Sequence, residues 1–504
     1  MYHLPRTFTF AMNQEIRPLL QSPALRQIEL SHAHLPLMER AGSAAFALAV
    51  QLLQDRTAQA LILVGPGNNG GDALVAARLL REKGFNPCVV LASDPERFPP
   101  DARNAFLAWQ ASGGTCYTDV PKGLYGLIID GLFGIGLTRP IDGIYAEWIQ
   151  AINQFPGPVL ALDCPSGLNA DTGMAPGPTV KASHTLTFIA RKPGLYTLEG
   201  PDHCGHISVA SLGLEAAVQT ASQGRLLDQE TGVHAFTDQL PRRALNSHKG
   251  SHGSVGIIGS APGMAGAALL AGRSALMVGA GRVYVGMLER LAVDPLQAEL
   301  MLRQADEVFD LATALAIGPG LGASHEALDL LRRAINCDKP LLIDADGLNL
   351  LAAHPALHRH VARRSATTVL TPHPLEAARL LDQGILAVQS DRISAAQRLA
   401  RQFNAEVVLK GAGSVIAAPN GQWAINGTGN PGLATAGTGD VLSGFIVALL
   451  AQGCPAHEAL AAAVHLHGLA ADHCVANGQG PLGLTASELL IPARRQLNEW
   501  VSQH

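Results

Sequence analysis

The feature that most constrains the fold is an alternation of short apolar runs, glycine-rich turns and amphipathic helices. It begins at Ala60 with ALILVGPGNNGGD and continues into ALVAARLLREKG, where Gly84 is predicted to end the helix. The later runs CVVLA, LIIDG, VLALD and TLTFIA are apolar on both faces, as in parallel strands covered by helices. The pattern predicts an α/β domain with a parallel sheet that extends to about Leu214.

The same alternation returns in the second half of the chain, after a polar stretch without periodicity. Strand candidates there are SVGIIGS, RVYVGML, ALAIGPG, PLLIDAD, TTVLTPH and AEVVLKG, and the tail from Asp440 is predicted to be mostly helical. A chain of 504 residues is also too long for one ordinary core. We therefore expect a first domain with an N-terminal extension at residues 1–215, a linker at 216–228 and a second domain at 229–504.

The amino-acid composition favours a small-molecule ligand over a nucleic acid or a membrane. The chain is 47% hydrophobic and 15% charged, with a net charge of -5, so neither disorder nor a nucleic-acid or anionic-membrane partner is indicated. Seven cysteines without a CxxC pair indicate reduced thiols, and the first thirty residues lack the apolar core of a signal peptide. We expect a cytoplasmic protein that binds small molecules and forms a homo-oligomer.

Polar side chains follow several strands of the first domain. A glycine-rich turn spans Gly65–Asp72 and opens a helix, while Asp130 and Asp163 stand at strand ends, the latter with Ser166 close behind. Ligands of open parallel sheets bind beyond the carboxyl ends of strands, so Asn69 and these groups are expected to converge in one crevice. The alternative is that the acids only cap turns. The oxygen donors of Asn69, Asp130 and Ser166 suit a hard cation rather than zinc.

Four segments make the resemblance of this half specific. AGSAAFALA, GPGNNGGDALVAARLL, DGLFGIGLTRP and LDCPSGLNADTG are together similar to the NAD(P)H-hydrate epimerase domain, also called the YjeF N-terminal domain, with its Rossmann-like α/β/α fold. Ala73 stands where that family usually has glycine. The resemblance implies a potassium ion held by Asn69, Asp130 and Ser166. It makes Asp163 the residue we expect to transfer protons, because epimerising a carbinolamine needs an acid or base near the ring. It also implies contacts with the hydrated nucleotide from Asn68, Asn69, Gly70, Gly71, Asp72, Gly134, Ile135, Gly136, Leu137, Thr138, Arg139, Pro140 and Asp163.

The stretch NPGLATAGTGDVLSG places Asp440 where a glycine-rich turn becomes a helix. Free N–H groups and the helix dipole would then lie beside a carboxylate, an arrangement suited to a phosphoryl group that meets a hydroxyl. The alternative is a simple helix-start charge worth about 0.3 to 1 kcal/mol. The flanking glycines argue against it, since a cap needs no such permissive backbone.

The rest of this half extends the comparison. KGAGS, GPGLG and TPHP resemble segments of the ribokinase-like fold, in which the GTGD aspartate acts as the base and magnesium neutralises phosphate charge. A vitamin or sugar kinase is the runner-up. HKGSHGSVGIIGSAPGMAGAALLAGRSALMVGAGRVYVG, LAIGPGLG, LIDADGLNLL, LTPHPLEAARLL and VVLKGAGSVI resemble the ADP-dependent NAD(P)H-hydrate dehydratase family. Leu375 and Ser414 depart from its usual TPHPGE and KGxxT.

This second resemblance implies two sets of contacts and a mechanism. A phosphoryl group from ADP would pass to the ring hydroxyl, activated by Asp440, and phosphate would then leave. Contacts with the hydrated nucleotide are implied for Ala267, Gly320, His373 and Asp440. Contacts with the adenine nucleotide are implied for Lys410, Gly411, Ala412, Gly413, Ser414 and Gly439.

Together the two resemblances predict a bifunctional repair enzyme for hydrated NADH and NADPH. One domain would interconvert the R and S hydrates and the other would dehydrate one of them. An N-terminal half that only binds or regulates remains an alternative. HLHGLAADHC offers His465, His467, His473 and Cys474, but helix positions i and i+2 do not share a face, which disfavours a metal site.

Overall fold

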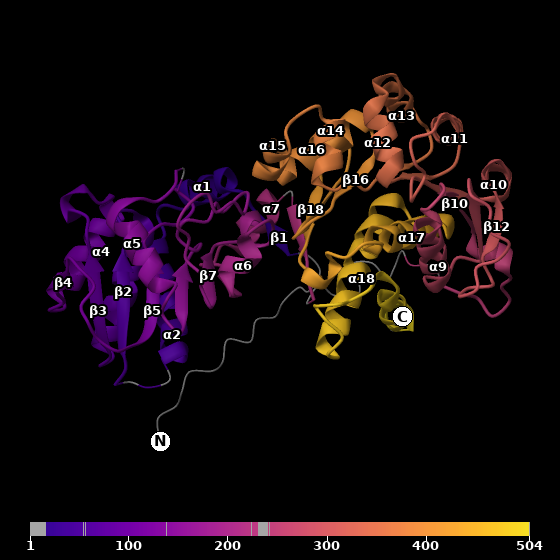
Figure 1. The fold of residues 1–504 in the computed structure, drawn as a ribbon. Coiled ribbons are helices and arrows are strands. Elements are labelled where there is room, and N and C mark those ends of the chain that lie inside the picture. The colour runs from indigo at the N-terminus through magenta and orange to yellow at the C-terminus, as the bar shows by residue number, and fades with distance from the viewer. Residues whose placement is uncertain are drawn as a thin grey trace.

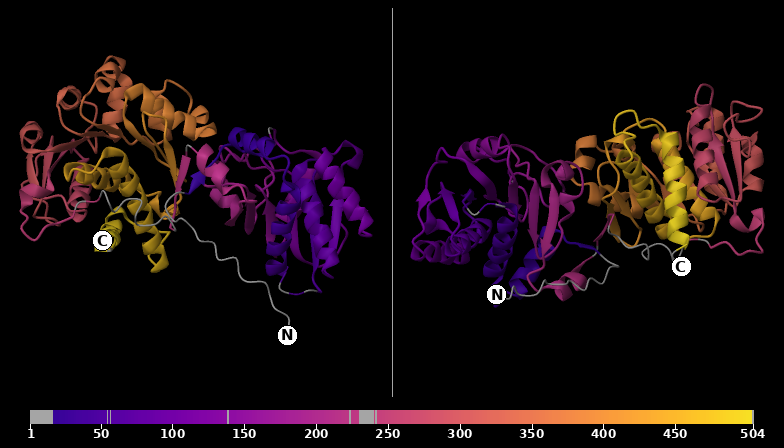
Figure 2. Two further views of the ribbon diagram at one scale, coloured as in Figure 1. Left: turned by 180° about the vertical axis from the view of Figure 1, so that it is seen from behind. Right: turned by 90° about the horizontal axis from the view of Figure 1, so that it is seen from below.

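The computed structural model describes residues 17–53, 55, 57–137, 139–222, 224–229, 240 and 242–502. The chain forms two lobes, an N-terminal one in indigo and magenta and a C-terminal one that ends in yellow (Figure 1). The two lobes are also separate in the views from behind and from below (Figure 2). The lobes are built on a 7-stranded and an 11-stranded sheet. The predicted pair of α/β domains is confirmed. Their numerical bounds stay predictions, and the extension at residues 1–16 lies outside the described residues.

The N-terminal sheet is parallel throughout, with strand order β4-β3-β2-β5-β6-β7-β8. The sequence pattern locates the inner strands because their residues are buried on both faces. The strands are β2 (Gln59–Val64), β3 (Asn86–Leu91), β4 (Cys116–Tyr117), β5 (Tyr125–Gly131), β6 (Val159–Leu162), β7 (His184–Phe188) and β8 (His206–Ala210).

Helices cover both faces of this sheet. One core lies against α2, α3 and α4, and a second core on the other face includes Trp148 and Ile149 of α5. This is the expected three-layer α/β/α arrangement. The helices are α1 (Ser22–Ser31), α2 (Leu37–Leu53), α3 (Asn68–Glu82), α4 (Pro100–Ala111), α5 (Gly143–Ile152) and α6 (Gly200–Cys204).

Helix α3 ends as its sequence predicts. Gly84 has a φ of 81°, and the N–H of Phe85 returns to the carbonyl of Leu80 at 2.9 Å. Glycine adopts this left-handed conformation without a steric penalty, so the chain can leave the helix and enter β3.

The C-terminal sheet has the order β1-β9-β18-β17-β16-β15-β14-β13-β10-β11-β12. The seven neighbouring strands from β16 to β12 in this order, which include β10 and β11, are parallel to one another. Strand β17 runs antiparallel between β16 and β18. The strands are β10 (Ser254–Gly259), β11 (Arg282–Met287), β12 (Met301–Gln304), β13 (Ala314–Ile317), β14 (Leu341–Ile343), β15 (Thr368–Leu370), β16 (Glu406–Leu409), β17 (Ser414–Ala417) and β18 (Trp423–Asn426).

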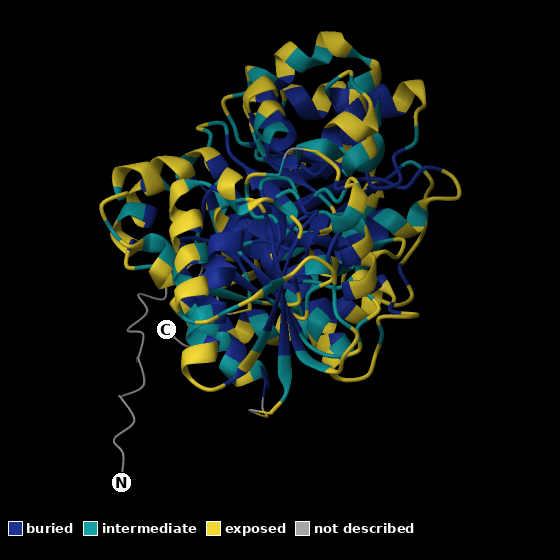
Figure 3. Ribbon diagram, turned by 90° about the vertical axis from the view of Figure 1, so that its left-hand side faces the viewer, coloured by how far each residue is buried: buried dark blue, intermediate teal, exposed yellow. Residues whose placement is uncertain are grey.

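Two cores again sandwich the sheet. One contains residues of α9, α17, α18 and α19, and the other contains residues of α10 to α14 and α16. Figure 3, in which the N-terminal lobe faces the viewer, shows buried strands in the interior and helices whose outer faces are exposed. The helices are α9 (Ala265–Met277), α10 (Ala305–Leu311), α11 (His325–Asn336), α12 (Ala345–Ala353), α13 (His358–Ala362), α14 (Pro374–Leu380), α15 (Ile385–Ser390), α16 (Arg392–Phe403), α17 (Thr438–Ala451), α18 (Ala456–Ala476) and α19 (Leu490–Ser502).

The segment between the domains differs from the irregular linker expected at residues 216–228. It continues helix α7 (Glu215–Ala221) and contains strand β9 (Gly224–Leu227), which pairs in parallel with β18. Strand β1 (Pro18–Leu19) then adds antiparallel to β9. Four residues between polar neighbours are too short to show periodicity, so the strand is fixed by its partner rather than by its own pattern. The larger sheet therefore includes chain from the N-terminal half.

Across the described ranges, none of the helices combines the length and hydropathy needed to cross a bilayer.

Candidate active sites

The N-terminal acids and the glycine-rich turn meet at one edge of the smaller sheet. Gly65 follows β2, Asp130 lies near the end of β5, and Asp163 follows β6. Because these strands are parallel, their carboxyl ends share that edge. Ser166 joins them directly, since its hydroxyl donates to Asp130 Oδ1 at 2.6 Å and its N–H donates to Oδ2 at 2.8 Å. The structure thus brings together residues from three strands.

Asp163 is held by a buried cation. Lys192 Nζ lies 2.5 Å from Asp163 Oδ1 and also donates to Thr187 Oγ1 and the carbonyl of Phe188, each at 2.7 Å. Lys192 is 1% exposed. Asp163 itself has a φ of 65°, a strained conformation that is uncommon outside glycine and concentrates at functional sites. The pair fixes the carboxylate of Asp163 at this edge of the sheet.

Asn69 and Asp72, on the first turns of α3, face the same place. A Cβ added at Gly134 would lie 2.8 Å from Asp163 Oδ2 and 3.5 Å from Asn69 Cγ, so these three residues are neighbours. Both polar atoms of the Asn69 amide are buried and have no hydrogen-bond partner within the described part of the chain. Burial, followed by the negative charge of Asp163, raises the pKa of Asp72 well above its usual range. Burial and the neighbouring carboxyl of Asp163 thus both favour the protonated form of Asp72.

Of the remaining residues predicted to contact the hydrated nucleotide, some are packed inside the protein and others are exposed. A Cβ at Gly70 would meet the carbonyl oxygen of Gly65 at 2.1 Å, so this glycine lets the turn close on itself. The N–H of Ile135 donates to Asp163 Oδ2 at 3.2 Å. Gly71 is buried, Leu137 is half-buried and Thr138 lies outside the described residues. The exposed members of the set are Asn68, Gly136, Arg139 and Pro140.

Asp130 is the most enclosed acid of this site. Its side chain is 0% exposed, and burial raises its pKa to about 6 despite the hydrogen bonds from Ser166 and Leu132. Ser166 Oγ also accepts from the N–H of Phe133 at 2.8 Å. The buried carboxyl is thus tied to the loop that follows β5.

The C-terminal site is built in the same way at the edge of the larger sheet. Gly318 follows β13, Asp344 follows β14, His373 lies beyond β15 and Lys410 follows β16. These strands are parallel neighbours, so the four residues lie at one edge. Gly318 allows close approach there, because a Cβ on it would lie 1.8 Å from the carbonyl oxygen of Asp344.

A buried ion pair lies at the centre of this edge. Lys410 Nζ is 3.0 Å from Asp344 Oδ1, and the hydroxyl of Ser443 donates to Oδ2 at 2.7 Å. Burial acts to raise the pKa of Asp344, but Lys410 and the hydrogen bonds outweigh it and the net pKa is lowered. Burial likewise acts to lower the pKa of Lys410, while Asp344 and Glu376 leave it raised. Both groups are therefore charged at neutral pH.

Asp440 lies in the first turn of α17, after Gly437 with its φ of 89°. Burial, and then repulsion by Asp344, raises the pKa of Asp440 to about 6 even though Lys410 acts in the opposite direction. A Cβ at Gly439 would lie 3.4 Å from Lys410 Nζ, which places the helix start beside the ammonium group. A carboxylate that can take up a proton near neutral pH thus lies next to free helix N–H groups.

His373 and Glu376 form the start of α14. His373 Nδ1 accepts from the N–H of Leu375 at 3.1 Å, and the N–H of His373 donates to Glu376 Oε2 at 2.8 Å. Burial raises the pKa of Glu376 to about 7, with Asp344 adding to the effect, whereas burial and then Lys410 lower the pKa of His373. This capping arrangement presents a neutral imidazole to the site.

The other predicted contacts lie on loops around this centre. A Cβ at Gly320 would meet Ala267 Cβ at 3.2 Å, so the loop after β13 packs on the start of α9. The turn after Lys410 is more open, with Gly411 and Ala412 exposed and Gly413 and Ser414 half-buried. Roles for all of these residues stay predictions.

Four residues of these centres were not predicted from the sequence. They are Lys192, Asp344, Glu376 and Ser443. Asp344 follows an apolar strand within LIDADGLNLL, which is the same signal that singled out Asp130 and Asp163. Lys192, Glu376 and Ser443 carry no such signal, because only the tertiary structure buries them.

His465 and His467 of α18 are packed in the protein core. His465 and His467 are buried, and burial lowers the pKa of each to about 4. The ring of His465 stacks on Trp500 with centroids 5.9 Å apart. Among the described side chains, no group of three or more His, Cys, Asp or Glu is arranged to hold a metal ion.

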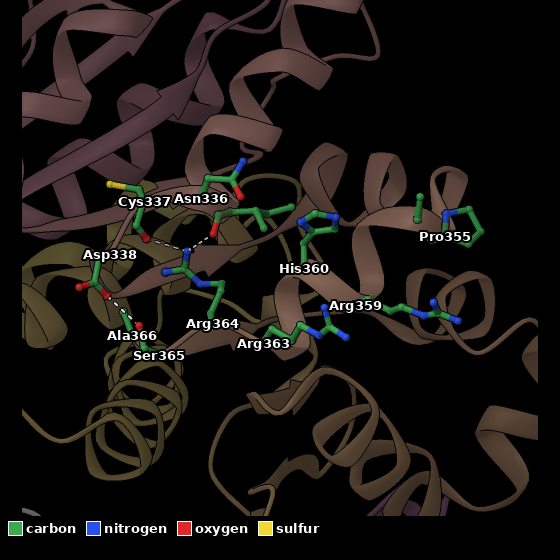
Figure 4. A pocket seen from close by; sticks show the side chains of 12 residues that line it. Asn336, Cys337, Asp338, Pro355, Arg359, His360, Arg363, Arg364, Ser365 and Ala366 are labelled. Carbon is green, nitrogen blue, oxygen red and sulfur yellow. Dashed lines mark hydrogen bonds between the residues drawn. The ribbon is translucent and has the colours of Figure 1, made fainter.

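A basic hollow of about 710 Å³ lies at the opposite edge of the larger sheet, near the starts of β14 and β15. Arg359, His360 and Arg363 line it together with Arg364 (Figure 4). Arg364 is committed to the fold, because its guanidinium donates to the carbonyls of Ala334, Ile335, Cys337 and Lys339. This hollow is separate from the acids at the carboxyl ends of the strands.

Comparisons with known proteins agree with this two-site arrangement. The family model described as NAD(P)H-hydrate dehydratase matches residues 255–491, and the one described as YjeF-related protein N-terminus matches residues 34–194. A bifunctional NAD(P)H-hydrate repair enzyme of Escherichia coli (strain K12) is 39% identical over 481 residues, covering 92% of this chain and 90% of the relative. The chain belongs to the family of bifunctional NAD(P)H-hydrate repair enzymes.

Another member of the repair-enzyme family, from Coxiella burnetii, is 39% identical over 498 residues, covering 96% of this chain and 99% of the relative. The solved ADP/ATP-dependent NAD(P)H-hydrate dehydratase of Bacillus subtilis, co-crystallised with ATP/Mg2+, is 29% identical and covers 53% of this chain. It is itself covered to 97%, with a TM-score of 0.47. Both family resemblances drawn from the sequence are confirmed.

Proposed function

We propose that this chain repairs hydrated NADH and NADPH with two activities. The N-terminal site interconverts the R and S hydrates, and the C-terminal site dehydrates the S form with ADP as phosphoryl donor, which yields AMP and phosphate. Family membership supports this proposal over a vitamin or sugar kinase. The observation that carries it is Asp440, a carboxyl with a pKa raised to about 6 that lies beside Lys410 at a helix start.

In the C-terminal site, Asp440 takes the proton of the ring hydroxyl while the hydroxyl oxygen bonds to the terminal phosphorus of ADP and AMP departs. The N–H groups of Gly437–Gly439 and the ammonium of Lys410 stabilise negative charge on the transferred group. Phosphate then leaves with the electrons of the ring C–O bond, and the adjacent ring carbon loses a proton to restore the double bond. Hydroxide leaves poorly and phosphate leaves well, so a kinase-like site can drive a dehydration.

In the N-terminal site, inversion requires a bond at the hydroxyl-bearing carbon to break and to re-form on the other face. Asp163 is placed to move the proton that accompanies this change. Lys192 holds that carboxylate in one orientation. The raised pKa of the neighbouring Asp72 favours its protonated form, so Asp72 can act as an acid beside Asp163.

The residues present fit a potassium ion in the N-terminal site. Asn69 has a buried amide without a partner in the described chain, and Asp130 and Ser166 supply further buried oxygens. When bound, such an ion would supply positive charge that attracts the oxygen atoms of the substrate. Asn69, Asp130 and Ser166 are the residues that would hold it.

Magnesium fits the C-terminal site for an electrostatic reason. Asp440 and Glu376 have pKa values raised to about 6 and about 7, each in part by Asp344, so the acids there exceed the nearby positive charge. A magnesium ion binds through one or two carboxylates together with substrate phosphates. It would neutralise the charge of the diphosphate, and Glu376 is the carboxylate that would hold it while Asp440 acts as the base.

Two further expectations belong to this proposal. A cytoplasmic location is the expected one, and the seven cysteines, all of which lie in the described part of the chain, are free thiols. A homo-oligomer is the expected assembly, and light scattering of the purified protein would measure it.

The direct test incubates the purified protein with a mixture of R and S NADH hydrate, magnesium and either ADP or ATP. Recovery of NADH absorbance beyond the S fraction shows that both sites are active. No recovery with either nucleotide would contradict the proposal. A phosphate ester that accumulates without NADH would identify a kinase instead.

The dehydration should depend on pH through Asp440. The base must be ionised, and burial raises its pKa to about 6, so kcat/KM should be constant above pH 7 and fall about tenfold per pH unit well below 6. Initial rates on the S hydrate between pH 5 and pH 9, values chosen to bracket this pKa, measure the profile. A rate that stays level down to pH 5 would contradict the role of Asp440 as base.

Potassium should stabilise the N-terminal domain through Asn69. At a potassium concentration of about 100 times Kd, binding adds about 2.7 kcal/mol to the free energy of unfolding. We expect potassium chloride to raise the Tm of the wild type relative to tetramethylammonium chloride of equal ionic strength. Asn69→Ala should remove this shift, whereas the exposed Asn104→Ala on α4 should keep it. Equal shifts in all three proteins would contradict a site at Asn69.

A further inference from the structure

The two domains touch at the turn that is expected to bind ADP. The N–H of Leu198, from the N-terminal domain, donates to the carbonyl of Ala412 at 3.1 Å. The hydroxyl of Thr197 lies 3.1 Å from the carbonyl oxygens of Ala412 and Gly413. Gly413 has a φ of 60°, and a Cβ on it would lie 2.0 Å from the carbonyl oxygen of Tyr196. The turn is thus in van der Waals and hydrogen-bonded contact with the other domain.

The side chain of Arg392 also supports the turn at residues 410–414. Its guanidinium is buried, with 2% of the residue exposed, and the Cβ of an alanine at Gly411 would lie 2.8 Å from Nη1. Nη2 donates to the carbonyls of Leu409 at 3.2 Å, Lys410 at 3.3 Å and Gly413 at 3.5 Å. The turn therefore wraps around this side chain.

Thr197 completes the partners of Arg392. Arg392 Nε donates to Thr197 Oγ1 at 3.1 Å, and Nη1 donates to Gln389 Oε1 at 2.9 Å. No carboxylate pairs with this guanidinium among the described residues, and burial lowers its pKa to about 10, so it remains charged. A buried cation held only by neutral oxygens depends on each of those hydrogen bonds.

The N-terminal end of this contact is itself anchored. Lys192, five residues before Thr197, is fixed by Asp163 and by the end of β7. Pro193–Leu195 then forms a short helical turn whose residues are buried, and Thr197 is 1% exposed. Thr197 thus reaches the turn from a rigid support.

We propose that Thr197 and Arg392 are positioning residues for the nucleotide turn at 410–414, so that the N-terminal domain completes the ADP site of the C-terminal domain. The inference rests on the proposed function, which assigns this turn to ADP. Thr197 directs its hydroxyl at two carbonyls of the turn and accepts from Arg392, which holds three carbonyls of the same turn and its preceding strand. Loss of the hydroxyl leaves the turn in several conformations, and ADP must then select one of them.

The test compares Thr197→Val with Thr197→Ser in the full chain. Valine keeps the shape and removes the hydroxyl, whereas serine keeps the hydroxyl and removes a methyl group. We expect Thr197→Val to raise KM for ADP about tenfold, with a smaller change in kcat, and Thr197→Ser to recover most of the lost affinity. The rate of epimerisation should not change in either variant, and the exposed Thr220→Val on α7 is the matched control.

Calorimetric titration with ADP separates this inference from the proposed function. If the wild type binds ADP and Thr197→Val binds it equally well, the positioning role is wrong while the function stands. A Thr197→Ser variant impaired as much as Thr197→Val would also overturn the role, because the methyl group and not the hydroxyl would then matter. A wild type that binds neither ADP nor ATP would remove the assignment of the turn and with it the inference.

Discussion

Asp440→Asn is expected to abolish dehydration while leaving epimerisation intact. General base catalysis contributes about 10² to 10⁴ in rate, and asparagine cannot accept the hydroxyl proton. The fold should tolerate the change, because burial raises the pKa of Asp440 to about 6, above its usual range. A carboxyl with a raised folded pKa favours folding in its neutral form, so the ionised group opposes folding at pH 7. A neutral amide should therefore leave Tm unchanged or raise it.

The measurement follows NADH recovered from the S hydrate with ADP, and R-to-S conversion in the same preparation. Asp310→Asn, on the exposed face of α10, is the matched control and should retain both activities. Loss of both activities in Asp440→Asn, with a lower Tm, would indicate misfolding. Dehydration at the wild-type rate would show that another group takes the proton.

The inner strands could be predicted because they are buried on both faces. VLAL of β6 and ALAI of β13 are continuously apolar, and a parallel sheet under two helical layers requires such runs. Strands at the edges lack this signal. β8 is HISVA with partly exposed residues, and β12 is MLRQ, so each is specified by the neighbouring strand.

Some residues of the candidate sites could likewise be predicted from the sequence, and others could not. Asp163 follows a strand and Asp440 follows a glycine turn, so the sequence alone marks both acids as candidate site residues. The sequence does not mark Lys192 in this way, because a lysine in a loop is ordinarily solvated. Its role depends on β7 and on the turn after it, which place its ammonium group against Asp163.

The join between the domains could not be predicted because it depends on pairing over a long sequence distance. β1 pairs with β9, and β9 pairs with β18, so residues 18–19 and 224–227 add to a sheet formed mainly after residue 254. The ion pair between Arg17 and Asp228, 2.6 Å apart, supports the same join. A two- or four-residue strand has no periodicity that a pattern could detect.

Asp163→Asn should reduce epimerisation about a hundredfold or more, because the amide cannot exchange a proton at the ring. It should also destabilise the N-terminal domain. Lys192 is 1% exposed, and a buried ammonium group that loses its partner costs about 3 to 5 kcal/mol. Its bonds to Thr187 and Phe188 remain, so the protein should fold with a lower Tm. Dehydration of the S hydrate in the same sample shows that the C-terminal domain is intact.

The double variant Asp163→Asn with Lys192→Met separates chemistry from stability. It removes both charges, so Tm should return toward the wild-type value, whereas epimerisation should stay at the level of Asp163→Asn. If epimerisation returned with Tm, the loss in the single variant would be structural and Asp163 would have no part in proton transfer. Epimerisation at the wild-type rate in Asp163→Asn would lead to the same conclusion. Loss of epimerisation with a restored Tm leaves the Asp163 carboxylate as the group that moves the proton.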